Sequence, residues 1–533
     1  MIGTKRATAE ADTVQPADGS FELLGDLDIC LIYEFLAIPK RYNVLRMKDF
    51  CRPTIHGRSD VDRMKDVVAL SGTCRRLRAI AMCQAARLGV WPHLMLTGDM
   101  VDRRTPPGVP RTIPTHFLGG VAFGCARYID DRWIPPSQSA ELVRTNSRSL
   151  VKVSLSTARP TTLAEVFALP QLREVAILPG NSPEPMPALA SPTLTSILVA
   201  TPSRALVDAL AAGSGLPRVS KVVVVADGAG NIAGVLRACP AVQSIGLFCA
   251  GRVRCAGLGS VIAGLAELRA VSMRGRGTLA PGQTYWWHAM RELELASGLT
   301  VLNAMGAGVY PRALRWLGQL VKLTVLRLTI VEVTDASVAV SAQEAATELV
   351  ALGNVAGAVP LLRVSLELDT TADIGPVFAT PRFRAVTRLS LHLHRIVPPV
   401  AVPPSAAATL RRLSCRIAGF DSVRPIMDTC AAVVHLRLGA TDSWGSRPGM
   451  FPPVPAGMPG VRPTSARIDT GNGMSMFAAT QLACRIAGNL RVLRVNTVGG
   501  EDCSEAWAQF LATDPTLRVG AIRGGRIFTA IRT

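Results

Sequence analysis

Two histidines stand two residues apart in the segment SLHLH, at His392 and His394. In a β-strand, alternate residues lie on the same face, so this spacing would place both imidazole rings side by side, where they could bind a metal ion. A metal site needs three or four ligands, and no Cys, Asp or Glu stands near the pair in the sequence. The sequence therefore predicts ordinary strand-surface histidines and no metal site.

A glycine-rich segment, VVVVADGAGNIAGVL at 222–236, has the order strand, turn and helix that binds phosphate groups in dinucleotide-binding proteins. That fingerprint requires G-x-G-x-x-G and an acidic residue about 20 residues further on. Here Gly228, Gly230 and Gly234 have the spacing G-x-G-x-x-x-G, and the following strand VQSIGLFC contains no acid. We therefore expect neither a nucleotide site nor another cofactor.

The cysteines also lack a pattern that supports chemistry. Twelve of them are spread from Cys30 to Cys503 without a C-x-x-C pair, which argues against a zinc ribbon and a dense disulfide framework. No P-loop, H-E-x-x-H or G-x-S-x-G motif occurs either. We therefore expect a non-catalytic protein with free thiols from a reducing compartment, the cytoplasm or the nucleus.

Charge and hydropathy argue against two further classes of protein, nucleic-acid-binding proteins and membrane proteins. The net charge of +19 would suit nucleic-acid binding, but only seven of the 58 basic residues are Lys, in a chain also rich in Ala, Gly and Val. This bias is typical of a GC-rich genome, so direct nucleic-acid binding is not favoured. No run of about 18 apolar residues lacks a charge or a Gly/Pro break, and the first residues do not resemble a secretory signal. The sequence thus predicts no membrane association.

The secondary structure around these residues can be predicted from a sequence pattern that recurs from residue 150 onward, apolar-x-x-apolar-x-apolar, called the phrase below. It begins at residues 150, 172, 194, 219, 242, 268, 290, 323, 361, 386, 410, 433 and 490. Most successive starts are 22 to 26 residues apart, which is the period of leucine-rich repeats. Segment 150–520 therefore resembles the leucine-rich-repeat family, although the usual Asn or Cys ladder is irregular. The resemblance implies an α/β solenoid, a curved parallel sheet with helices or turns on its convex side.

Two segments before the repeats have helical apolar stripes, LGDLDICLIYEFL at 24–36 and VVALSGTCRRLRAIA at 67–81. They resemble the two halves of an F-box, a Leu-x-Asp helix start followed by an apolar-Ser-x-x-Cys-basic-basic-apolar helix. Gly25 stands where the family usually has Pro, and about 30 residues separate two halves that normally lie closer together. A helical cap that only shields the first repeat is the structural alternative.

The F-box resemblance implies that this head docks on a Skp-type adaptor of a cullin-RING ubiquitin ligase, while the repeats bind the substrate. The residues expected to contact the adaptor are Leu24, Leu27, Ile32, Phe35, Leu36, Leu70 and Leu77. The alternative is a leucine-rich-repeat scaffold or binding protein unrelated to ubiquitin. The expected domains are a disordered tail (1–19), the F-box-like helical module (20–95, with an insert at 37–66), a connector (96–148) and the solenoid (149–525, with a Pro/Gly-rich insert near 442–464).

Strand geometry places the residues that flank the last two apolar positions of each phrase on the open concave face. In the later repeats these residues are mostly basic, and we expect them to form the partner-binding surface: Arg327, Arg363, Arg388, His392, Arg412, Arg416, His435, Arg437 and Arg494. Guanidinium groups suit bidentate capture of carboxylate or phosphate, so an acidic or phosphorylated protein segment is the expected ligand. The alternative is that Arg is simply common in this chain and solvates the strands.

Overall fold

The computed structural model describes the chain from residue 128 onward, with gaps. The described residues are 128–131, 136–148, 150–155, 159–178, 185–213, 215–226, 232–249, 258–275, 296–309, 314–331, 342–369, 373–394, 398–417, 423–440, 463–469, 479, 486, 489–496, 507–508, 511–512, 516–523 and 527–532. The helical module expected over 20–95, its insert and most of the insert near 442–464 lie outside them. The chain divides into two compact units, Met1–Val175 and Ala176–Thr533.

The described part of the first unit contains β1 (Tyr128–Asp130), α6 (Pro136–Thr145), β2 (Lys152–Leu155) and α7 (Pro160–Phe167). β1 pairs in parallel with β2, and Ile129 and Val153 are fully buried. The Ser139 hydroxyl donates a hydrogen bond of 2.8 Å to the Asp131 carboxylate. The described part of the connector expected over 96–148 thus contains one strand and one helix.

The second unit is a sheet of short parallel strands. β3 (Glu174–Ile177) spans the boundary between the units, and the strands that follow are β4 (Ser196–Ala200), β5 (Lys221–Ala226), β6 (Ser244–Cys249), β7 (Ala270–Gly275), β8 (Val301–Val309), β9 (Val325–Val331), β10 (Arg363–Asp369), β11 (Arg388–Leu393), β12 (Arg412–Ile417), β13 (His435–Ala440), β14 (Ser465–Asp469) and β15 (Val492–Asn496). Every successive pair from β4 to β15 is parallel. The sheet ends in antiparallel pairs, because β17 (Ile527–Arg532) pairs with β15 and with β16 (Leu517–Arg523).

The recurring phrase forms the core of this sheet. Its three apolar positions are buried in each described repeat; in the β9 repeat, for example, Leu323, Leu326 and Leu328 have no exposed surface. One strand alone could not remove these side chains from water, but stacked neighbours share a continuous apolar layer. The period of the phrase in the sequence is therefore the number of residues between one strand of the sheet and the next.

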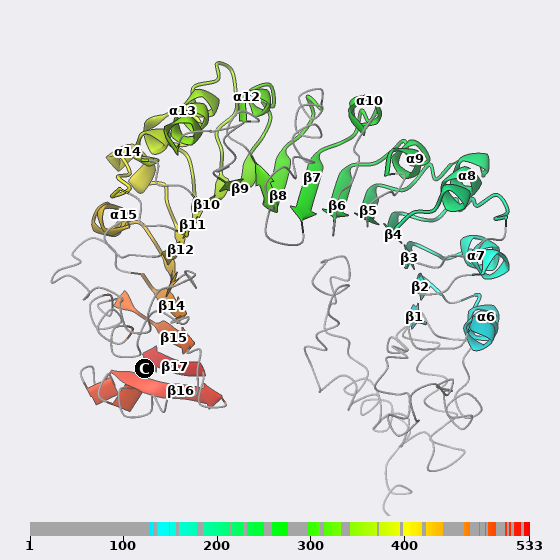
Figure 1. The fold of residues 1–533 in the computed structure, drawn as a ribbon. Coiled ribbons are helices and arrows are strands. Elements are labelled where there is room, and N and C mark those ends of the chain that lie inside the picture. Colours follow the sequence, from blue (N-terminus) through cyan, green and yellow to red (C-terminus); the bar gives the residue numbers. More distant parts are fainter. Residues whose placement is uncertain are drawn as a thin grey trace, which may run out of the picture. The chain divides into compact units, whose positions relative to one another are not determined.

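Helices and turns cover the other side of the core, and in Figure 1 the helices of the second unit lie along the outer side of its arc of strands. They are α8 (Arg204–Ala212), α9 (Ile232–Arg237), α10 (Leu258–Ala263), α12 (Leu314–Leu317), α13 (Ala342–Gly353), η4 (Gly375–Ala379), α14 (Pro404–Ala407) and α15 (Arg424–Thr429). The Ser203 side chain caps α8 by accepting a hydrogen bond from the Leu206 N–H. This architecture confirms the predicted leucine-rich-repeat solenoid.

Hydroxyl groups take the place of an asparagine ladder between the repeats. The second residue of several phrases is Thr, and its hydroxyl donates to the backbone carbonyl of the second residue in the preceding repeat. The O···O distances are 3.1 Å for Thr300, 3.2 Å for Thr324 and 2.9 Å for Thr387. Each bond ties one rung of the solenoid to the next at the start of the strand.

The phrases found in the sequence do not include the repeat that contains β8. β8 begins within the segment LTVLNA (299–304), whose Leu299, Leu302 and Ala304 are fully buried, and this segment lies within the step of 33 residues between the predicted starts at 290 and 323. The step of 57 residues before the start at 490 predicts an additional, degenerate repeat near 466–471, and β14 matches this repeat. The phrase at 290 lies outside the described residues. None of the described helices is long and apolar enough to span a membrane.

Candidate functional site

The face of the sheet opposite the helices, called the open face here, carries the polar residues of the strands. In β11, Leu389, Leu391 and Leu393 are buried, whereas Ser390 and His392 between them are partly exposed and Arg388 is exposed. Strand register extends this alternation to the neighbouring strands. It places all nine predicted residues on the open face: Arg327, Arg363, Arg388, His392, Arg412, Arg416, His435, Arg437 and Arg494.

Three of these arginines stand directly side by side. Arg363, Arg388 and Arg412 are register partners on β10, β11 and β12, and all three are exposed. Paired strands are about 4.8 Å apart, so the three cations form one row, called the arginine row below. None of the three forms an ion pair or a side-chain hydrogen bond with another residue that the structure describes.

The charges of the arginine row act on one another. Arg363 and then Arg412 lower the pKa of Arg388 from its ordinary value. The pKa of Arg327, on the neighbouring β9, is also lowered, by burial and then by the nearby cations Arg274 and Arg363. Mutual repulsion of this kind costs folding free energy, and a bound anion would relieve it. The arginine row is therefore expected to be more stable with an anionic ligand bound than in the free protein.

Further along the sheet, the arginines are engaged within the protein. Asp469 on β14 accepts from Arg437 Nη2 at 2.7 Å and from Arg467 Nε at 2.9 Å, and it also accepts from Asn496. Burial raises the pKa of Asp469, but the hydrogen bonds from these arginines outweigh burial, so that the pKa is lowered overall. Arg494 Nε donates to Asn496 Oδ1 at 3.1 Å. Arg437 and Arg494 are thus part of the predicted surface but are less free than the arginine row.

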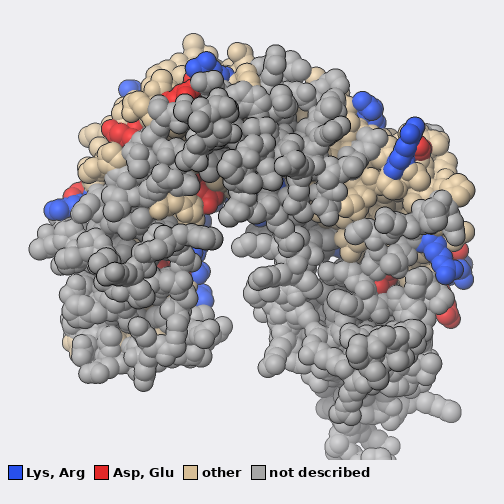
Figure 2. Space-filling view, viewed as in Figure 1, with Lys and Arg blue, Asp and Glu red and all other residues tan. Residues whose placement is uncertain are grey.

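Abundance of Arg does not by itself distinguish the open face. Figure 2 shows Lys and Arg (blue) at several places on the outer, helical side of the second unit as well as along its inner edge near β12 to β14. The distinguishing feature is the mutual proximity of Arg363, Arg388 and Arg412 without a carboxylate partner among the described residues.

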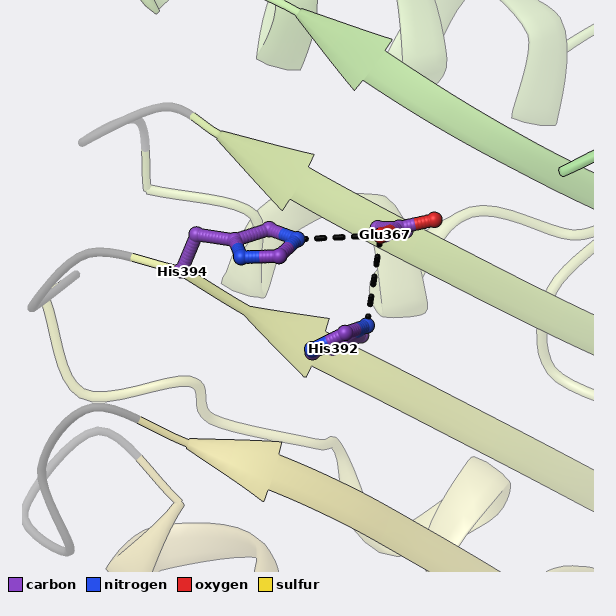
Figure 3. Close-up of side chains that lie close together, drawn as sticks. All are labelled: Glu367, His392 and His394. Carbon is purple, nitrogen blue, oxygen red and sulfur yellow. Dashed lines mark hydrogen bonds and ion pairs between the residues drawn. The ribbon is translucent and has the colours of Figure 1, made fainter. Parts of the chain in front are cut away.

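The two histidines singled out in the sequence do have an acidic neighbour, which corrects the expectation that no third ligand lies near them. Glu367 on β10 is the register partner of His392 on β11. Its Oε1 atom lies 3.3 Å from His392 Nδ1 and 3.0 Å from His394 Nε2. In Figure 3 both imidazole rings point toward this carboxylate. Sequence reasoning missed Glu367 because it belongs to the preceding repeat.

The other oxygen of Glu367 also has a partner. Thr329 on β9 donates its hydroxyl to Glu367 Oε2 at 2.6 Å, which fixes the orientation of the carboxylate. The hydrogen bonds from His392 and His394 outweigh burial and hold the pKa of Glu367 well below its ordinary value. The carboxylate is therefore charged at neutral pH and aims one oxygen at the two rings.

The thiols that the structure describes are unsuited to nucleophilic chemistry. Cys239, Cys415 and Cys430 are buried free cysteines. Burial raises the pKa of Cys239 to about 12, and it also raises the pKa of Cys415 and Cys430. A thiol of this kind is protonated at neutral pH and packs as a small apolar side chain.

Comparison with known proteins adds little to these observations. No protein-family model matches the chain. No curated protein matches it either. Among solved structures, the chain is similar to an internalin from Listeria monocytogenes, with 11% sequence identity, coverage of 57% of this chain and 82% of that chain, and a TM-score of 0.26. A likeness of this size carries no argument about function, so the solenoid assignment rests on the parallel ladders and the repeated core.

Proposed function

We propose that this chain is a binding protein whose open face holds an acidic or phosphorylated segment of a protein partner. The observation that carries the proposal is the arginine row, three exposed guanidinium groups in register without a carboxylate partner among the described residues. Leucine-rich-repeat solenoids provide extended concave surfaces of this kind for partner proteins.

The geometry favours an extended anionic segment over a single ion. Each guanidinium can form two parallel hydrogen bonds to one carboxylate or phosphate. Successive cations along the row are separated by about one strand spacing, roughly 4.8 Å. An extended peptide that crosses the strands therefore meets Arg363, Arg388 and Arg412 in turn, with Arg327 and Arg416 at the sides.

A charge reversal tests this surface in the full-length chain. Short fluorescein-labelled Ser/Glu/Gly peptides with and without phosphoserine serve as probes, and binding is followed by fluorescence anisotropy. Arg388→Glu combined with Arg412→Glu is expected to weaken peptide binding about tenfold or more, and most strongly at low salt, where screening is weakest.

The matched control reverses two exposed arginines away from the open face, Arg218 in the turn before β5 and Arg237 in α9. Arg218→Glu with Arg237→Glu changes the net charge by the same amount and is expected to leave peptide binding unchanged. Equal losses in the two double variants, or duplex DNA that binds as tightly as the phosphopeptide, would contradict the proposal, because either result indicates nonspecific attraction to a basic protein.

The finer proposal is that residues 20–95 dock on a Skp-type adaptor, so that the chain acts as the substrate receptor of a cullin-RING ubiquitin ligase in the cytoplasm or the nucleus. Its support is the resemblance of the two N-terminal segments to an F-box, and these residues lie outside the described part of the chain. In such a complex, the receptor would act by proximity, raising the effective concentration of substrate lysines.

Capture of a purified Skp-type adaptor tests this assignment. Truncating a buried interface anchor typically costs about 2 kcal/mol or more. Ile32→Ala with Phe35→Ala should therefore abolish capture while peptide binding by the open face persists. Capture that survives this double change would exclude F-box docking. If the adaptor is never captured and the double variant loses the repeat fold, the N-terminal helices are a solenoid cap and the chain is a scaffold unrelated to ubiquitin.

A further inference from the structure

Three potential metal ligands, one on β10, one on β11 and one directly after β11, converge on the open face. Glu367, His392 and His394 each offer one ligand atom, and these atoms lie within 4.8 Å of one another. Both imidazole nitrogens approach the same carboxylate oxygen, Glu367 Oε1, at 3.0 and 3.3 Å (Figure 3). Two hydrogen bonds to one oxygen are possible without a metal, but the convergence of two nitrogens and one oxygen is also the donor set of a metal site.

We infer that Glu367, His392 and His394 form a binding site for a divalent transition metal ion, with Zn²⁺ as the best-suited ion. Two imidazoles and one carboxylate are a common ligand set of open zinc sites and also suit other divalent transition metals. This inference goes beyond the proposed partner binding and does not depend on it.

The distances agree with such a site. Tetrahedral Zn²⁺ with bonds of about 2.0–2.1 Å holds its ligand atoms roughly 3.3 Å apart. The separations of Glu367 Oε1 from the two imidazole nitrogens, 3.0 and 3.3 Å, are already close to this value. The two histidine side chains are 21% and 37% exposed, so rotation of the rings can adjust the distance between their nitrogens.

The surroundings supply the outer support that metal sites usually have. The Thr329 hydroxyl holds Glu367 Oε2 at 2.6 Å, which leaves Oε1 directed toward the histidines. Second-shell hydrogen bonds of this kind orient a ligand and typically change metal affinity by about 10–100-fold. Arg416 on β12 is the register partner of His392, and its positive charge would repel a bound cation. Because Arg416 is exposed, water and salt screen this repulsion.

Three protein ligands leave one position of a tetrahedral ion open. Water would fill this position in the free protein, as in zinc sites with three protein ligands. Arg388 lies on the same face of β11 as His392 but roughly 13 Å away along the strand, so a second acidic side chain of a partner held by the arginine row could occupy this position. The site would then add a direct bond to the partner-binding surface.

The test measures binding of Zn²⁺ alone to the full-length, metal-stripped chain by titration calorimetry. Substitution with Co²⁺ reports the geometry, because a tetrahedral cobalt complex absorbs strongly in the visible range. The variants are Glu367→Gln, His392→Ala and His394→Gln, and Thr329→Val probes the outer support. His435→Ala is the matched control, since His435 is an exposed histidine on the same face in β13.

We expect one Zn²⁺ per chain, with loss of binding in each of the three ligand variants that exceeds the loss of about 10–100-fold in Thr329→Val. His435→Ala should bind as the unmodified chain does, and Arg416→Gln should bind more tightly. A thermal unfolding curve of each variant shows whether it is folded. If His392→Ala does not fold, His394→Gln still tests the site, because His394 lies beyond the end of β11. Absence of Zn²⁺ binding, unchanged binding in the ligand variants, or equal loss in His435→Ala overturns the inference.

Discussion

At the scale of single residues, Arg382 shows how a charge can serve the core of the solenoid. The residue is only 2% exposed, and its Nη2 atom donates to the carbonyls of Leu320 and Leu323 at 2.6 and 3.4 Å. Its Nε atom donates to the Val359 carbonyl at 3.3 Å. One side chain thus satisfies three backbone acceptors in the turns that join two repeats, although burial lowers its pKa.

Arg382→Met should destabilise the fold, because the apolar replacement removes three hydrogen bonds to backbone carbonyls, two of which belong to the buried residues Leu320 and Leu323. A loss of about 3 kcal/mol in the free energy of unfolding is expected by urea denaturation. Arg384→Met is the control, since Arg384 is exposed and its side chain bonds, among the described residues, only to the nearby Ala379 carbonyl, so the effect should stay within about 0.5 kcal/mol. Similar effects of the two changes would show that the buried bonds contribute little.

Asp469 makes the stability of the C-terminal repeats depend on pH. Its pKa in the folded chain is lowered from the ordinary value of 3.8, since Arg467 and Arg437 outweigh burial. A lowered folded pKa stabilises the fold above the unfolded pKa, and this contribution is lost as the pH falls through the folded pKa. Asp469→Asn should therefore cost about 1 kcal/mol at neutral pH and progressively less below pH 3.8. A difference between the two proteins that does not change with pH would contradict this assignment.

At the scale of elements, the hydroxyl ladder predicts a measurable coupling between repeats. Thr387→Val removes the bond to the Leu362 carbonyl but keeps the shape of the side chain. The free energy of unfolding should fall by about 1 kcal/mol. Thr347→Val in α13 removes a bond within a helix at an exposed position and should change stability by less than about 0.5 kcal/mol. If both variants unfold at the same denaturant concentration as the unmodified chain, the ladder does not stabilise the solenoid.

The strands could be predicted from sequence wherever a repeat keeps bulky apolar residues at all three phrase positions. The β11 repeat does so with Val386, Leu389 and Leu391, all of which are buried. β8 was missed because its third position is Ala304, which is buried but small. β1 was missed because this strand of three residues carries no complete phrase. The local sequence pattern thus predicts a repeat only when bulky apolar residues occupy all three phrase positions of that repeat.

The open face could be predicted as a surface from single strands, whereas its internal partners require the register between repeats. Alternation along one strand places Arg388 and His392 on the same side, which requires no knowledge of other repeats. Pairing of Glu367 with His392 requires the register between β10 and β11. Aligning the phrases at 361 and 386 gives this register, so the signal was present in the sequence. The pairing of Asp469 depends on a degenerate phrase that follows an insert, and no comparable alignment was available there.

At the scale of the whole molecule, the net charge of +19 is less informative than its local arrangement. Arginines near the C-terminal end of the sheet are engaged by Asp469, whereas the arginine row has no acidic partner among the described residues. General attraction to polyanions would follow from the total charge alone. Selective binding of an acidic or phosphorylated segment requires the unpaired row.

Arginine footprinting of the full-length chain tests the central claim most directly. Phenylglyoxal modifies accessible guanidinium groups, and mass spectrometry measures the modification of each arginine with and without a saturating phosphopeptide. Bound peptide should protect Arg363, Arg388 and Arg412, while Arg218 and Arg237 react as before, because bidentate contacts block the reactive nitrogens. Protection spread evenly over these five arginines, or no protection of the arginine row by a peptide that binds, would contradict the claim.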